Sequence, residues 1–181
     1  TLLNMLGGLD RPTEGTVFVD GKDIFSLKDE ELTIFRRRKI GFVFQAYNLV
    51  PVLNVYENIV LPIQLDGNEV DKDHIDEINS VLGLSEKTQS MPNQLSGGQQ
   101  QRVAIARALA TKPSIILADE PTGNLDSKTS QDVLGLMKTS CTRFRQTLIM
   151  ITHNEEIAQM ADRIIRIEDG RVVMKGGALH E

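Results

Sequence analysis

Three short apolar runs divide the chain, and each of them ends at a polar residue. Continuous apolar runs of this length indicate strands that are covered on both faces, as in a parallel sheet. The runs span residues 40–44, 115–118 and 148–151, and they are followed by Gln45, by Asp119 and Glu120, and by Thr152 and His153.

Helical patterns separate the predicted strands. Residues 71–84 place four apolar side chains on one face at helical spacing, and residues 97–110, 127–138 and 155–160 predict three further helices. Strands that alternate with helices predict an α/β fold with a mostly parallel core sheet. Because residues 47–111 are mostly helical, we expect a helical subdomain there, within a single domain that spans 1–181.

Two sequence signals predict antiparallel β-hairpins in addition to the parallel sheet. Asp20-Gly21 interrupts the apolar pattern of residues 16–24, and Asp169-Gly170 interrupts that of residues 163–174. A two-residue Asp-Gly loop between short apolar runs is a strong signal for a β-hairpin.

The polar residues after the apolar runs carry the candidate chemistry. In open parallel sheets, ligands bind beyond the carboxyl ends of the strands, so neighbouring strands would bring these side chains together. We expect Asp119 to hold Mg²⁺, Glu120 to orient or deprotonate an attacking water, and Gln45 to complete the metal shell. His153 could donate a hydrogen bond to a terminal phosphate. Taken singly, the two acidic residues could equally form an exposed acidic turn, and a lone histidine after a strand is more often a structural hydrogen-bonding residue.

A second candidate segment begins at Ser96. Serine followed three residues later by Gln99 is a capping-box pattern, which predicts the start of a helix. Capping does not explain Gly97 and Gly98, which each cost about 1 kcal/mol relative to alanine in a helix. Glycines there suit the close approach of a phosphate to backbone N–H groups. Asp126 is most simply the N-cap of another helix.

Composition narrows the class of protein. The 181 residues include 40% hydrophobic and 25% charged residues, which is ordinary for a soluble domain. The net charge of -5 argues against a nucleic-acid partner. The single cysteine excludes an internal disulfide and fits a reducing compartment. No apolar run reaches the roughly 18 residues of a membrane span, so a membrane role requires a partner. We expect His74 and His180 to be surface residues.

Several segments together resemble the ATP-binding cassette (ABC) ATPases. LSGGQQQR at 95–102 resembles the family signature, and SIILADEP at 114–121 resembles the Walker B strand with its catalytic glutamate. FVFQ at 42–45 resembles the Q-loop, residues 123–126 the D-loop, and THN at 152–154 the switch histidine. Finer features at 47–62, 119–127 and 161–173 are similar to the branch that powers macrolide exporters, lipoprotein-release systems, bacitracin-type resistance pumps and the cell-division permease complex.

The resemblance implies a fold, ligands and partners. It implies a P-loop NTPase-like core with an antiparallel β subdomain and a helical subdomain, binding ATP and Mg²⁺. Two cassettes would bind head to tail as a homodimer, so that Ser96, Gly97, Gly98 and Gln99 face the phosphate held by the second copy, with Asp126 nearby. Glu120 and His153 would be catalytic, and the cassette would drive an integral-membrane permease from the cytoplasmic face of a bacterial plasma membrane.

One departure concerns the start of the chain. The family begins with a strand and a glycine-rich P-loop that ends in Gly-Lys-Ser-Thr, and Thr1 aligns with that last threonine. We therefore expect the first strand and the P-loop to precede this sequence, leaving Thr1 as a nucleotide-binding residue. A chain without the P-loop would bind ATP poorly, since its backbone N–H groups form the main phosphate cradle.

The alternatives are a soluble cassette of DNA repair or translation and a non-catalytic regulatory cassette. Soluble cassettes of DNA repair separate the Q-loop from the signature by a long coiled coil, yet Gln45 and Ser96 are about fifty residues apart, with no sustained heptads. Translation factors carry two cassettes and basic linkers, which this sequence lacks. A non-catalytic regulatory cassette would be favoured by the loss of Glu120 or His153, and both are present.

Overall fold

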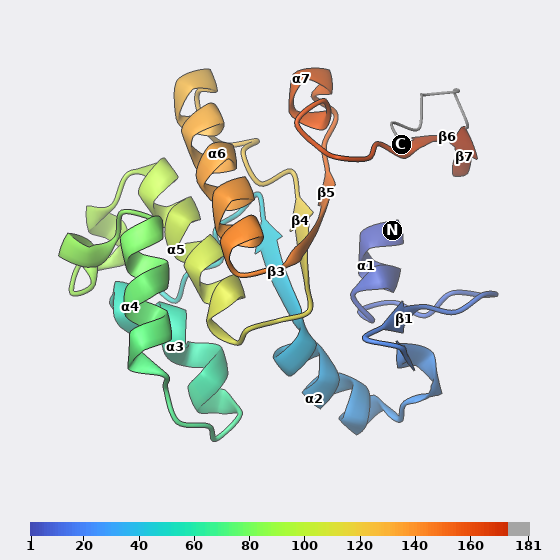
Figure 1. The fold of residues 1–181 in the computed structure, drawn as a ribbon, viewed down its shortest axis with the longest axis horizontal. Helices are drawn as coiled ribbons and strands as arrows, with labels where there is room; N and C mark the ends of the chain where they lie inside the picture. The colour runs from blue at the N-terminus through green and yellow to red at the C-terminus, as the bar shows by residue number, and fades with distance from the viewer. Residues whose placement is uncertain (174–181) are drawn as a thin grey trace. The chain divides into compact units, whose positions relative to one another are not determined.

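Three adjacent parallel strands form the central sheet, as the apolar runs predict. In a computed structural model that describes residues 1–173, the order is β3 (Ile40–Phe44), β4 (Ile115–Asp119) and β5 (Thr147–Ile151) (Figure 1). Phe44 is paired with Asp119, and Asp119 with Ile151. The three carboxyl ends are therefore in register at one edge of the sheet.

Four helices cover one face of this sheet and form the main core. They are α3 (Val55–Leu65), α4 (Lys72–Val81), α5 (Gly97–Ala110) and α6 (Ser127–Arg143) (Figure 1). Ile116 and Ala118 of β4 are fully buried in this core, whereas Leu117, equally buried, belongs to a cluster on the other face. Coverage of both faces explains why β4 is continuously apolar.

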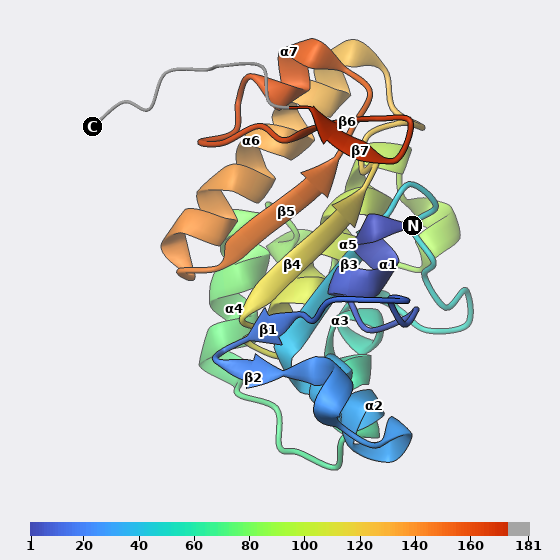
Figure 2. The same cartoon turned by 90° about the vertical axis from the view of Figure 1, so that its right-hand side faces the viewer.

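The opposite face is covered by the N-terminal part of the chain. Helix α1 (Leu2–Leu6) packs there through Leu3, followed by the hairpin of β1 (Phe18–Val19) and β2 (Lys22–Asp23) (Figure 2). A short 3-10 helix (Ile24–Ser26) and α2 (Asp29–Lys39) then lead into β3, and two further 3-10 turns, Ser85–Lys87 and Pro92–Gln94, precede α5. The hairpin turn has positive φ angles at both central residues, as an Asp-Gly loop favours.

The chain divides into two compact units, and the second begins at Thr152. Its described part contains α7 (Glu155–Ala158) and a hairpin of β6 (Arg166–Glu168) and β7 (Arg171–Val173). Arg166 forms an ion pair with Glu155 at 3.3 Å. Met174, expected to end the last strand, and His180 lie outside the described residues. Within residues 1–173, none of the helices is long and apolar enough to span a membrane.

Candidate functional site

The aligned strand ends bring Gln45 and the two acidic residues to one edge of the sheet. Gln45 follows β3 directly, Asp119 is the last residue of β4, and Glu120 comes next. Phe44 and Asp119 are partners in the parallel ladder, so Gln45 and Glu120 leave the sheet from neighbouring positions. Asp119 is exposed, and Glu120 is half-buried. The arrangement agrees with the ligand position in open parallel sheets.

The backbone of Glu120 is unusual. Its φ angle is +44°, in the left-handed region that few side chains adopt. Its N–H donates to the carbonyl oxygen of Ile151 at 3.0 Å, and its own carbonyl oxygen accepts from the N–H of Gly123 at 3.0 Å. These two hydrogen bonds hold a conformation that costs about 1–3 kcal/mol, of a kind that clusters at active sites.

Gln45 is joined to the loop after Glu120. Its Nε2 donates to Oδ1 of Asn124 at 3.1 Å, and Nδ2 of Asn124 donates to the backbone oxygen of Gln45 at 3.0 Å. Asn124 received no role in the site from sequence alone. A side-chain pair that is 79 residues apart leaves no local signal in the sequence.

His153 and Thr1 are placed less directly. His153 belongs to the second unit, two residues after the end of β5, and its approach to the carboxylates stays a prediction. Thr1 is the N-cap residue of α1 without a side-chain capping bond, and its carbonyl oxygen accepts from the N–H of Met5 at 3.2 Å. Its contact with a nucleotide also stays a prediction.

The capping box at the start of α5 is confirmed. Oγ of Ser96 accepts from the N–H of Gln99 at 3.3 Å, and Oε1 of Gln99 accepts from the N–H of Ser96 at 2.9 Å. The Oε1 atom of Gln99 is therefore occupied by the capping hydrogen bond within its own helix.

The two signature glycines have a packing reason within the chain. A Cβ at Gly97 would lie 2.7 Å from the hydroxyl oxygen of Tyr47, and one at Gly98 would lie 2.5 Å from Cγ2 of Thr129. From the sequence we expected both glycines to admit an approaching phosphate. These close contacts disfavour a side chain at either position without any ligand, so the phosphate contact stays a prediction.

Asp126 is confirmed as the N-cap of α6. Its Oδ1 accepts from the N–H of Thr129 at 3.0 Å, and its Oδ2 accepts from Oγ1 of the same residue at 2.6 Å. These hydrogen bonds, the side-chain one above all, lower the pKa of the Asp126 carboxyl. Its expected contact with a nucleotide is a separate prediction.

The oxygen donors at the strand ends fit a cation that is shared with a ligand. Residues 1–173 contain no cluster of three His, Cys, Asp or Glu side chains that could hold a metal alone. Asp119 supplies an exposed carboxylate, and Gln45 supplies an amide oxygen. Mg²⁺ is commonly held by one or two carboxylates together with substrate phosphates and water, so this sparse set suits it.

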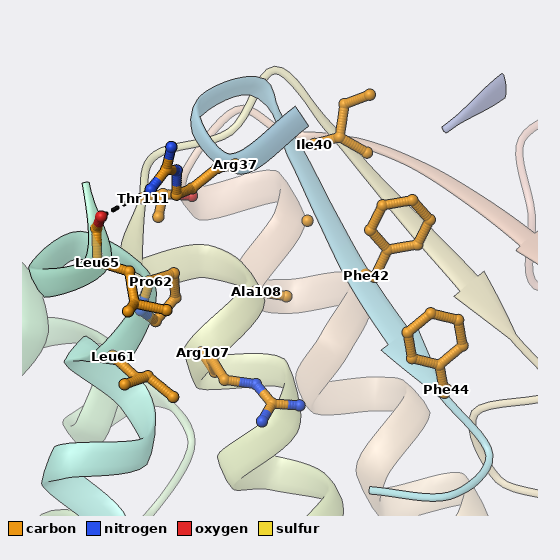
Figure 3. Close-up of a pocket in the computed structure, with 11 residues that line it drawn as sticks. Arg37, Ile40, Phe42, Phe44, Leu61, Pro62, Leu65, Arg107, Ala108 and Thr111 are labelled. Carbon is orange, nitrogen blue, oxygen red and sulfur yellow. Dashed lines mark hydrogen bonds between the residues drawn. The ribbon is translucent and has the colours of Figure 1, made fainter. Parts of the chain in front are cut away.

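A cavity of about 270 Å³ has a different lining, which includes Phe44 but neither Gln45 nor the two acidic residues (Figure 3). It is bounded by the edge of β3, by α3 and by α5. Nη1 of Arg37 donates to the carbonyl oxygen of Leu65 at 2.6 Å across its end. Nη1 and Nη2 of Arg107 donate to the carbonyl oxygens of Asn48 and Tyr47, at 2.6 and 3.0 Å. This cavity and the candidate site are two separate features of the first unit.

Comparisons with known proteins identify the family of this chain. The family model described as "ABC transporter" matches residues 1–123. An uncharacterized ABC transporter ATP-binding protein of Thermotoga maritima is 49% identical over 95% of this chain and 74% of its own length. The lipoprotein-releasing system protein LolD 1 of Rhodopseudomonas palustris is 43% identical over 95% of this chain and 77% of its own.

This chain is also similar to part of a larger protein and to a cassette of known structure. The macrolide export ATP-binding/permease protein MacB of Syntrophobacter fumaroxidans is 45% identical, and the match covers 99% of this chain but 26% of that protein. The cassette MJ0796 of Methanocaldococcus jannaschii, solved as a dimer in a post-hydrolysis state bound to ADP and Pi, superposes with a TM-score of 0.80 at 45% identity. That match covers 94% of this chain and 76% of the solved one. The chain therefore belongs to the ABC transporter family, as an ATP-binding cassette close to the MacB, LolD and MJ0796 branch.

Proposed function

We propose that this chain carries the hydrolytic centre of a transporter ATPase that cleaves ATP with water in the presence of Mg²⁺. The observation that carries the proposal is the strained Glu120 backbone immediately after Asp119, at a sheet edge shared with Gln45. Two adjacent acidic residues, one at the end of the strand and the next with a left-handed backbone, suit two different tasks.

The residues divide the reaction between them. Asp119 and the amide oxygen of Gln45 would hold Mg²⁺, which, when bound, neutralises charge on the phosphate oxygens. Glu120 accepts a proton from the attacking water, and two backbone hydrogen bonds fix its main chain at the strand end. His153 donates a hydrogen bond to the terminal phosphate oxygen.

A second copy of the cassette completes the proposed site. Ser96, Gly97 and Gly98 open a helix of 14 residues, whose N-terminal N–H groups and dipole favour a phosphate. In the proposed homodimer this helix end meets the nucleotide bound by the other copy, with Gln99 and Asp126 at the same interface. The dimeric structure of MJ0796 supports this assembly.

We further propose that the cassette drives an integral-membrane permease from the cytoplasmic face of a bacterial plasma membrane. The name of MacB combines an ATP-binding part with a permease, and LolD belongs to a lipoprotein-releasing system. These relatives support a transporter of the export or extrusion type. Nucleic acid is not a proposed partner, because the net charge is -5.

The test of hydrolysis is Glu120→Gln in the product of the complete reading frame that encodes this chain. Loss of a general base lowers rates by about 10²–10⁴-fold, so we expect at least a hundredfold lower ATPase activity. ATP binding should persist, and light scattering should show an ATP-dependent dimer. Glu86→Gln, an exposed glutamate in a 3-10 turn, is the matched control. Hydrolysis at the wild-type rate by Glu120→Gln contradicts the assignment.

A further inference from the structure

Two amide side chains from distant parts of the chain are paired at the candidate site. Nε2 of Gln45 donates to Oδ1 of Asn124 at 3.1 Å, while Nδ2 of Asn124 donates to the backbone oxygen of Gln45 at 3.0 Å. Both hydrogen bonds join the same two residues. Asn124 therefore contacts the side chain and the main chain of Gln45 at once.

The backbone contact determines how both amides are oriented. A carbonyl oxygen can only accept, so the group of Asn124 that faces it must be the NH₂ group. Oδ1 of Asn124 then faces the side chain of Gln45, and an oxygen there can only accept as well. Gln45 must therefore present its Nε2 to Asn124, which leaves Oε1 as the atom available for a ligand.

The absence of a side chain at Gly123 leaves the space that the Gln45 carboxamide occupies. A Cβ added at Gly123 would lie 2.6 Å from Nε2 and 2.9 Å from Cδ of Gln45. Real Cβ atoms essentially never come so close, so any side chain at this position would push the carboxamide away. The carboxamide rests against Gly123 on one side and is hydrogen-bonded to Asn124.

We propose that Asn124 is a positioning residue that fixes the orientation of the Gln45 carboxamide and so keeps Oε1 available for the nucleotide-bound cation. Hard cations such as Mg²⁺ take oxygen ligands, and an amide turned the other way would offer N–H groups that repel the metal. This inference rests on the proposed function, in which Gln45 is a cation ligand. It adds a residue that acts through Gln45 and does not itself touch the cation.

The first test needs no nucleotide. The side-chain amide protons of Gln45 are observed by ¹H–¹⁵N NMR in the wild-type protein and in Asn124→Ala. A hydrogen bond of ordinary net strength shifts an equilibrium by about three- to tenfold, so we expect these protons to exchange with solvent faster by that factor in the variant. Unchanged resonances and unchanged exchange in Asn124→Ala overturn the pairing.

The second test measures the cation. Binding of Mn²⁺ with a non-hydrolysable ATP analogue is followed by electron paramagnetic resonance in Asn124→Ala, Gln45→Ala and the double variant, each made in the product of the complete reading frame that encodes this chain. We expect Asn124→Ala to weaken Mn²⁺ binding about three- to tenfold, and to have no further effect once Gln45 is alanine. Asn68→Ala, an exposed asparagine on another loop, should bind as the wild type does.

Two outcomes separate this inference from the proposed function. Equal weakening by Asn124→Ala with and without Gln45 would mean that Asn124 acts by another route, and the inference fails while the function stands. A wild-type protein that binds no Mn²⁺ with the analogue overturns both. Gly123→Ala is an independent variant for the case that Asn124→Ala disturbs the fold of the loop. It retains both amide side chains, but its new methyl group should displace the Gln45 carboxamide and so weaken Mn²⁺ binding as Asn124→Ala does.

Discussion

His74 is a half-buried titratable group on α4, whereas the sequence predicted a surface residue. Its ring packs edge-on against Phe144 at 5.3 Å between centroids, and its Nε2 lies 3.4 Å from the carbonyl oxygen of Leu109. Burial lowers the pKa of His74, and the positive charge of Lys112 acts in the same direction, against the bond to Leu109 and the nearby Asp71 and Glu77. The folded protein thus favours the neutral ring.

This shift predicts a pH-dependent stability. The folded-state pKa lies below the unfolded value, so the unfolded chain binds the proton more readily. The free energy of unfolding should be highest above about pH 7 and fall as the pH drops through the unfolded pKa of about 6.5. Urea unfolding between pH 7.5 and 5.5 measures it. His74→Gln should flatten the curve in this range, and a slope unchanged in that variant would assign the effect to another group.

At the scale of elements, the first turn of α5 depends on contact with α6. An alanine methyl at position 98 would lie 2.5 Å from Cγ2 of Thr129, and that side chain is held by the bond from its Oγ1 to Asp126. Turning the Thr129 side chain aside would break its Oγ1 bond to Asp126, although the capping bond from the Thr129 N–H would remain. The steric clash of an alanine methyl at this helix crossing therefore outweighs the gain in helix propensity that alanine has over glycine.

We predict opposite effects for two glycine-to-alanine changes in these helices. Gly98→Ala should lower the free energy of unfolding by about 1–3 kcal/mol through overpacking. Gly135→Ala in α6 has open space around the new methyl and should raise it by about 0.5–1 kcal/mol. Urea unfolding of both variants checks this pair. Stabilisation by Gly98→Ala would show that the α5–α6 contact is loose.

Sequence patterns predicted some elements closely and missed others for physical reasons. The runs at β3 and α5 have the observed bounds, because burial on both faces and a capping box leave clear signals. Helix α3 was predicted only as part of a helical region, since it contains Pro62 and is apolar on more than one face. The position of Gln45 at the same sheet edge as Asp119 follows from the parallel order of neighbouring strands. The link to Asn124 does not, because it arises only from tertiary folding.

At the scale of the whole molecule, the cavity along β3 is a candidate docking groove for the proposed permease. Its walls include Leu61, Pro62 and Leu65, and Leu65 is 65% exposed (Figure 3). Exposed apolar surface in a groove is typical of an interaction site. The strand that forms one wall ends at Phe44, directly before Gln45, so a partner seated in the groove would touch the element that positions the candidate cation ligand.

The groove predicts a variant that separates docking from ATP chemistry. Leu61→Glu would place a carboxylate in the apolar wall of a groove that also holds Arg37 and Arg107, and burying that charge against an apolar partner surface would be unfavourable. We expect at least a tenfold loss of permease in co-purification from membranes, with ATP-dependent dimerisation of the isolated cassette retained. Phe18→Glu, an equally drastic change at an exposed residue of the β1 hairpin, should leave co-purification intact. If Phe18→Glu abolishes the association and Leu61→Glu does not, the permease contacts the face of the β1 hairpin.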